Sequence, residues 1–239
     1  MKKGLKKIAL IGGLMLAGGI YSEGTFDINS KKEETHEKLS NLLEKQYEVH
    51  NTLRLEDLLK EEREKFSKPL YLSPDLLNAY IKQAYREVQK WPKEFDKRLF
   101  RLMLRQESRY NVHAKSKSGA MGLGQIMPIT YKNFRPEEFA KLRDSMDIKR
   151  ELFNPVKNIG LSLECLEDNS KFCERNYPSW DTLNLEDQRK TILACYNAGP
   201  GRIKELNWNL NSKELKEEQR KYPKVIMDAY HDSKIKVKL

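Results

Sequence analysis

The sequence has few residues that could hold a metal ion or a network of disulfides. Its 239 residues include three cysteines and four histidines. The histidines are scattered and lack the spacing of a zinc site, so we expect no metal. Three cysteines leave at least one unpaired. Cys165 and Cys173 are close enough in sequence to bridge, and free buried thiols are the alternative.

Charge of one dominant sign is also missing. The chain has 45 basic and 35 acidic residues, a net charge of +10 and a pI near 9.3. Lysine and arginine alternate with acidic residues along the chain, and no dense basic run contains aromatic residues. This pattern is typical of a solvated mixed-charge surface, so we do not expect nucleic acid as a partner.

An apolar run without charge covers residues 8–20, directly after four lysines. A basic segment followed by about 7–15 apolar residues is typical of a secretory signal. The run is shorter than the roughly 20 residues of a membrane-spanning helix. We therefore predict that residues 1–22 are a signal peptide, cleaved after Ser22, or an uncleaved N-terminal anchor. The protein is then exported to the periplasm or cell envelope, and it touches the membrane only if that N-terminus is retained.

The rest of the chain divides into a charged helical extension, residues 23–72, and a main domain, residues 73–239. The extension is either a docking segment for a partner or an accessory arm. In the main domain, Ser73-Pro74-Asp75 is typical of a helix start. Apolar periodicity predicts that this helix ends near Trp91-Pro92 and that a second one carries Glu107 near its C-terminal end. Further helices are expected around residues 137–142, 156–166, 186–196 and 213–230. Strand patterns are nearly absent, so the predicted fold is mostly α.

Residues 107–130 read ESRYNVHAKSKSGAMGLGQIMPIT. An acidic residue ends a helix, and a stretch with three glycines follows, where the backbone can pass close to a ligand or another segment. If apolar side chains crowd Glu107, burial raises its pKa, because burial disfavours the charged form. A general acid that works at neutral pH needs this property.

A second motif, ACYNAGPGR, covers residues 194–202 and ends a predicted helix in a Gly-Pro-Gly turn. Such an abrupt end presents Tyr196 and Asn197 as hydrogen-bonding groups at the wall of a cleft. Taken alone, each motif has a simpler explanation, since most glycine-rich turns are only turns and most acids at helix ends are solvated.

Together the two motifs closely resemble those of the lytic transglycosylases with a goose-lysozyme-like catalytic domain, the soluble lytic transglycosylase type. That family has E-S-x-x-N-x-x-A-x-S-x-x-G-A-x-G-L-x-Q-I-M-P-x-T, followed by A-x-Y-N-A-G-P-G-R, and the similarity here covers roughly residues 75–230. The resemblance implies a lysozyme-like helical catalytic domain. It also implies cleavage of the MurNAc–GlcNAc β-1,4 bond of peptidoglycan with formation of 1,6-anhydroMurNAc ends, and no cofactor.

The resemblance also implies roles for individual residues. Glu107 would be the catalytic acid and base, Ser108 would fix its surroundings, and Tyr196 would reach its carboxyl group. Residues 218–222 look like a weakened E-T-R-x-Y segment, which makes Glu218 a candidate for the cleft wall, although Glu217 or a plain solvated helix face fits almost as well. The saccharide subsites would be lined by Ser116, Gln125, Met127 and Asn197.

Three positions depart from the family pattern. Gly124 stands where methionine is usual, Ser162 where the N-I-x-x-G segment has glycine, and Cys195 where alanine is common. None of these changes removes a catalytic group. They bear on how the substrate fits and not on which reaction is expected.

Two other functions fit the same residues. A lysozyme-type hydrolase would need a second carboxylate to activate water, and Asp144, Asp147 and Asp168 are candidates. A non-catalytic wall-binding component of a secretion apparatus would keep the cleft without turnover. The expected partner is the peptidoglycan glycan strand, and an envelope or secretion-machinery protein is a candidate partner for the extension.

Overall fold

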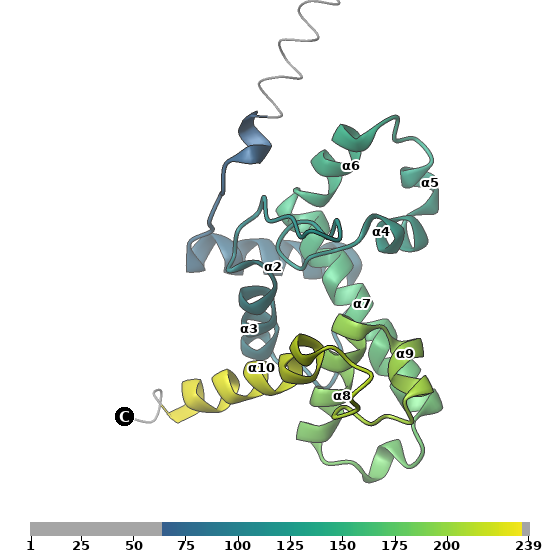
Figure 1. The fold of residues 1–239 in the computed structure, drawn as a ribbon. Coiled ribbons are helices and arrows are strands. Elements are labelled where there is room, and N and C mark those ends of the chain that lie inside the picture. The colour runs from purple at the N-terminus through teal and green to yellow at the C-terminus, as the bar shows by residue number, and fades with distance from the viewer. Residues whose placement is uncertain (1–63, 236–239) are drawn as a thin grey trace, which may run out of the picture. The chain divides into compact units, whose positions relative to one another are not determined.

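A computed structural model describes residues 64–235, which all belong to one compact unit, Glu61–Leu239. The predicted signal or anchor, residues 1–22, and most of the predicted extension lie outside the described residues. Figure 1 shows that the described part is built of helices joined by loops. The helices are α2 (Pro74–Val88), α3 (Lys97–Ser108), α4 (Pro128–Phe134), α5 (Pro136–Phe139), α6 (Ser145–Leu152), α7 (Pro155–Asn176), η1 (Trp180–Thr182), α8 (Leu185–Ala198), α9 (Pro200–Glu205) and α10 (Glu217–Ile235).

The prediction of a mostly α fold is confirmed. Within residues 64–235 the β-structure is limited to isolated bridges around the loop that follows α3. In that same range no helix combines the length and the apolar character needed to span a bilayer.

The predicted helices differ from the observed ones mainly in length. Ser73 caps α2 as expected, because its hydroxyl accepts a hydrogen bond from the backbone N–H of Leu76 at 3.3 Å. The helix predicted over residues 156–166 continues ten residues further as α7, and α10 begins four residues later than predicted. The short helices α4, α6 and α9 were missed, because fewer than nine residues give little periodicity to read.

Helix α7 is the centre of the unit and contacts α2, α6, α8 and α9 (Figure 1). Its apolar side chains on several faces, including Ile159, Leu161, Leu163 and Leu166, are fully buried. A helix that is apolar on several faces has to be surrounded by others. Among the polar residues that α7 also buries, Asn158 and Ser162 lie against the loop that follows α3.

Helix α10 packs along α3 and is bonded to it at both ends. Near the start of α3, Asp96 accepts a hydrogen bond from the hydroxyl of Tyr230, and Arg98 Nη2 donates to the backbone oxygen of Tyr230 at 2.8 Å. Near the end of α3, Glu107 accepts a hydrogen bond from Tyr222. The position of Glu107 is thereby set from two helices.

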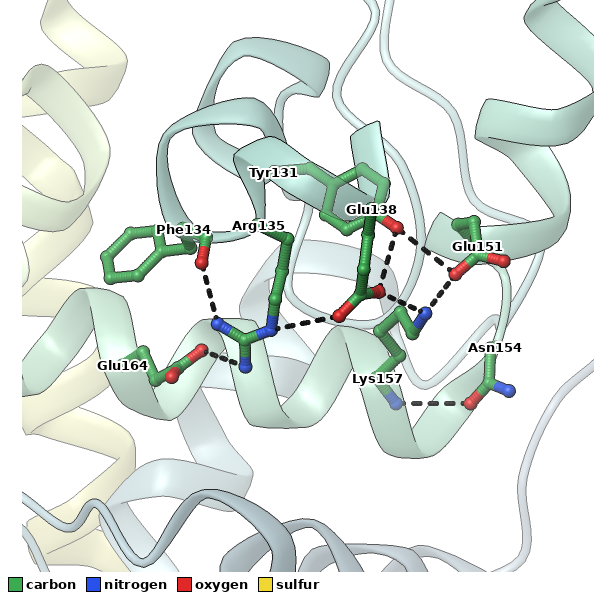
Figure 2. A network of polar contacts seen from close by, with 8 residues as sticks. All are labelled: Tyr131, Phe134, Arg135, Glu138, Glu151, Asn154, Lys157 and Glu164. Carbon is green, nitrogen blue, oxygen red and sulfur yellow. Dashed lines mark hydrogen bonds and ion pairs between the residues drawn. The ribbon is translucent and has the colours of Figure 1, made fainter. Parts of the chain in front are cut away.

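An ionic network joins α4–α6 to α7 (Figure 2). Lys157 on α7 pairs with Glu138 at 2.8 Å and also with Glu151. Arg135 pairs with Glu164 of α7 at 2.8 Å. These opposite charges hold the short helices against the central helix, in addition to the core residues Tyr131, Met146 and Leu152 that α4 and α6 bury.

The described end of the predicted extension packs on the loop after α3. Leu70 accepts a hydrogen bond from the backbone N–H of Val112 at 2.8 Å, and Leu72 donates to the backbone oxygen of Tyr110 at 3.1 Å. The Phe66 ring lies edge-on to His113 with ring centroids 5.3 Å apart. Residues 66–72 therefore brace the loop that begins at the candidate site.

Candidate active site

Glu107 lies in the last turn of α3, where the helix is stopped by its own sequence. The two residues after Ser108, Arg109 and Tyr110, have φ of 53° and 65°, a left-handed conformation that ends a helix. The buried Ser108 hydroxyl donates to the backbone oxygen of Leu104 at 3.1 Å and accepts from the N–H of Tyr110 at 3.1 Å. Ser108 thus fixes the helix end that presents Glu107.

The hydroxyl of Tyr222 on α10 donates a hydrogen bond to Glu107 Oε1. The prediction gave this role to Tyr196, but the Tyr196 hydroxyl donates to the backbone oxygen of Gly124 at 2.7 Å. In this structure the hydrogen bond to the acid therefore comes from Tyr222 and not from Tyr196, and sequence spacing did not reveal which tyrosine bonds the acid. The signal for Tyr222 was present as the tyrosine of the weakened E-T-R-x-Y segment.

The surroundings of Glu107 favour its neutral form. Burial raises the pKa of the Glu107 carboxyl to about 7, and the hydrogen bond from Tyr222 opposes this rise only in part. Burial and the nearby carboxylate also raise the Tyr222 pKa well above its ordinary value, so this phenol stays protonated as a donor. Glu107 therefore has the pKa of a general acid–base at neutral pH.

The glycine-rich loop is bound to α7 by one buried amide side chain. Asn158 Nδ2 donates to the backbone oxygens of Met121 at 2.9 Å and Leu152 at 2.7 Å, and Asn158 Oδ1 accepts from the N–H of Gly124 at 2.8 Å. Gly122, with φ of 79°, lies so close that a Cβ there would overlap both Asn158 and the Leu152 carbonyl. The sequence signal for this contact was an asparagine directly before the apolar residues Ile159 and Leu161 of α7.

A groove of about 660 Å³ opens beside this loop. Three predicted residues lie in its wall: Gln125, Met127 and Tyr196. Burial is the main cause of a Tyr196 pKa well above the ordinary value, followed by the charges of Cys165 and Glu107. The groove is lined by Gln125, Ile126, Met127, Thr130, Asn133, Phe134, Cys165, Asp168, Asn169, Lys171, Phe172, Arg175, Cys195, Tyr196, Gly199 and Pro200.

The three other predicted substrate-binding residues, Ser116, Asn197 and Glu218, are outside this lining. Ser116 closes a turn, since its hydroxyl oxygen accepts from the N–H of Ala120 at 2.9 Å. Asn197 is exposed at the end of α8. Glu218 is exposed one helical turn before Tyr222 and borders a separate shallow hollow with Lys216, Glu217 and Lys221. The binding roles assigned to Ser116, Asn197 and Glu218 stay predictions.

All three cysteines are free thiols. Cys173 faces Cys195 across α7 and α8 with 3.6 Å between the sulfurs, and not Cys165. Burial is the main cause of a Cys165 pKa of about 12. A thiol with so high a pKa is not a nucleophile at neutral pH, so Cys165 does not supply a nucleophile to the groove.

Comparison with known proteins identifies the family of the chain. The sequence matches the family model described as "Transglycosylase SLT domain" over residues 84–220. Among solved structures, the chain is similar to the 70 kDa soluble lytic transglycosylase SLT70 from Escherichia coli, with 26% identity and a TM-score of 0.45. The similar region covers 61% of this chain and 22% of that one. Because the family match spans more than half of the sequence, the chain belongs to the transglycosylase SLT domain family, as its two motifs indicated.

Proposed function

We propose that the protein is a lytic transglycosylase that cleaves the MurNAc–GlcNAc β-1,4 bond of peptidoglycan and leaves 1,6-anhydroMurNAc ends. The observation that carries this proposal is Glu107, an acid whose pKa of about 7 leaves a large protonated fraction at neutral pH. The loop that follows α3 borders a groove whose volume suits several sugar rings, although Glu107 itself is not among the residues that line it. Membership of the transglycosylase SLT domain family supports the same reaction.

In the proposed mechanism Glu107 first donates its proton to the glycosidic oxygen. The bond from that oxygen to MurNAc C1 breaks, and C1 takes on oxocarbenium character. The Glu107 carboxylate then accepts the proton of the MurNAc C6 hydroxyl as that oxygen bonds to C1. The attacking hydroxyl is already part of the reacting sugar, so its proximity favours ring closure and no water is consumed.

Tyr222 orients the carboxyl during both proton transfers. Its hydrogen bond goes to Oε1, which leaves Oε2 for the sugar. As a neutral donor, Tyr222 stabilises the carboxylate that forms after the first transfer without adding a cation that would keep Glu107 ionised beforehand. Gln125, Met127 and Tyr196 form the part of the groove wall on which the glycan would lie.

The alternative of a lysozyme-type hydrolase now depends on one residue. Asp144 caps α6, accepting from the N–H groups of Met146 at 2.7 Å and Asp147 at 2.9 Å. Asp147 itself pairs with Arg150 at 2.5 Å. Only Asp168 of the three candidate bases is among the groove residues, where it is exposed.

The test is mass spectrometry of fragments released from purified peptidoglycan by the wild type, Glu107→Gln and Asp168→Asn. We expect anhydromuramoyl ends from the wild type and Asp168→Asn, and no product from Glu107→Gln. Reducing ends that disappear in Asp168→Asn would instead establish hydrolysis. Binding of peptidoglycan without any product from the wild type would support the non-catalytic wall-binding component.

We also propose that the protein is exported to the periplasm or cell envelope, as the basic and apolar pattern of residues 1–22 indicates. Its substrate would be the glycan strand, and residues 23–72 are the candidate contact for an envelope or secretion protein. Cell fractionation with and without residues 1–22 tests the export. An unchanged cytoplasmic location for both chains would contradict it.

A further inference from the structure

The two departures from the family pattern at positions 124 and 162 meet in the structure. A Cβ added to Gly124 would overlap the hydroxyl oxygen of Ser162 and lie 3.0 Å from its Cβ. Ser162 is fully buried on α7, and Gly124 is buried in the loop that precedes α4. The glycine and the larger residue have thus changed places between two segments 38 residues apart.

The backbone of Gly124 does not by itself demand glycine. Its φ lies outside the left-handed range, whereas Gly119 and Gly122 have φ of 93° and 79°. What excludes a side chain at position 124 is the side chain of Ser162, supported by the hydroxyl of Tyr196, which would lie 3.0 Å from an added Cβ. Interiors are packed closely enough that one additional methyl group at such a point is felt.

Ser162 is held firmly in this place. Its hydroxyl donates to the backbone oxygen of Asn158 one turn earlier at 2.8 Å. Asn158 in turn accepts from the N–H of Gly124 at 2.8 Å, and the carbonyl of Gly124 accepts from Tyr196 at 2.7 Å. The N–H of Gly124 is therefore bonded to α7 and its carbonyl is bonded to α8.

We propose that Ser162 and Gly124 form an interlocked pair, in which Ser162 is a positioning residue that sets where the Gly124 backbone, and with it the groove wall at Gln125 and Met127, can lie. Ser162 fills the space that a side chain at 124 would occupy in the family pattern. A side chain can be added at position 124 without this overlap only when the side chain at position 162 is made smaller.

The inference rests on the proposed function for its catalytic consequence. Gln125 follows Gly124 directly and lines the groove, while Glu107 is oriented separately by Tyr222. A displaced loop should therefore weaken glycan binding and raise KM more than it lowers kcat. The pH dependence of kcat should not move, because no contact of Glu107 changes.

The test is a graded series that introduces Gly124→Ala into the wild type, Ser162→Ala and Ser162→Gly. In the wild type the new methyl group meets the Ser162 hydroxyl, so we expect KM to rise about tenfold and the melting temperature to fall by about 4–8 °C. Ser162→Ala removes the overlap with the hydroxyl and leaves the Cβ of residue 162 and the Tyr196 hydroxyl, each at 3.0 Å, so it should rescue part of both effects. Ser162→Gly should rescue them most, and the double change Gly124→Met with Ser162→Gly should be tolerated better than Gly124→Met alone.

Gly201→Ala is the matched control. Nothing lies within 4 Å of a Cβ added there, so its small effect should be the same in all three backgrounds. Equal penalties for Gly124→Ala in every background, or a loss of kcat with KM unchanged, would overturn the interlock. If the wild type lacks transglycosylase activity, the proposed function fails, while the melting temperatures of the same series still decide whether the pair is interlocked.

Discussion

Helix α3 carries a carboxylate near each end, and a tyrosine of α10 donates a hydrogen bond to each of them, yet the two acids differ in charge. Burial raises the pKa of Glu107 to about 7. Burial acts in the same direction on Asp96, but hydrogen bonds from Tyr230 and from the N–H groups of Leu99 and Arg98, together with the Arg189 charge, lower its pKa overall.

The difference follows from the direction of the helix. At the N-terminus, unpaired N–H groups and the positive end of the helix dipole stabilise a carboxylate. Glu107, at the opposite end, gains neither and has one neutral phenol as its partner. A carboxyl group bonded to a tyrosine is thus a helix cap at one end of α3 and, under the proposed function, a proton donor at the other.

We expect the largest effect on activity, and the clearest difference between Glu107 and Asp96, when each acid is replaced by its amide. Glu107→Gln should lower kcat by roughly 10²–10⁴-fold, since it removes general acid–base catalysis, while the protein stays folded. Asp96→Asn should leave kcat within a few-fold of the wild type, because asparagine also caps helices. Initial rates on peptidoglycan and circular dichroism of both variants make the comparison. Equal loss of activity in the two would contradict the assignment.

The next test removes the phenol from Glu107. Tyr222→Phe should lower kcat about 10- to 100-fold, because hydrogen bonds to charged groups contribute about 1.5–3 kcal/mol and each 1.4 kcal/mol is about tenfold. The acid form is needed first, so kcat falls as pH rises through about 7. The lost hydrogen bond had lowered this pKa, and the fall should therefore move to higher pH.

Tyr196→Phe is the control for that shift. It loses the bond to the backbone oxygen of Gly124 and leaves the contacts of Glu107 intact. Its kcat should fall at the same pH as the wild type, whatever happens to KM. Suppose that Tyr196→Phe moved the pH at which kcat falls and Tyr222→Phe did not. Tyr196, and not Tyr222, would then be the tyrosine that bonds to Glu107.

A third test weakens the capped end. Asp96→Ala removes the acceptor for the N–H of Leu99, at 2.8 Å, and for Tyr230. We expect the free energy of unfolding to fall by about 1–2 kcal/mol, as for other lost caps, with kcat per folded molecule unchanged. Urea unfolding followed by tryptophan fluorescence measures this loss. A lower kcat with unchanged stability would show that α10 transmits the change to Glu107.

The sequence predicted the helices and helix caps of the protein better than the contacts between its side chains. Ser73-Pro74 and the periodicity before Glu107 were local signals, and α2 and α3 were found where they were expected. The bond from Tyr222 to Glu107 joins positions 115 residues apart, and nothing local ranks it above one from Tyr196. The contact of Gly124 with Ser162 is equally long-range. In the sequence, Gly124 and Ser162 were two separate departures from the family pattern, and only their packing against each other connects them.

The smallest effect, and the one that separates the two acids most directly, is the pH dependence of stability. The folded pKa of Glu107 is raised above its ordinary 4.5 to about 7. Its contribution to stability is therefore full below about pH 4.5 and is lost as pH rises through about 7. For Asp96 the folded pKa is below its ordinary 3.8, so its contribution is present above that value and is lost as pH falls further.

We therefore expect Glu107→Gln to gain a few degrees of melting temperature relative to the wild type between about pH 5 and about pH 8, since about 1 kcal/mol corresponds to about 2–4 °C for a domain of this size. The difference in melting temperature between Asp96→Asn and the wild type should become smaller only at low pH. Thermal unfolding of the three proteins across pH makes the comparison. Parallel curves for Glu107→Gln and the wild type would mean that Glu107 is ionised in the folded protein at neutral pH, and then it would not be the proton donor.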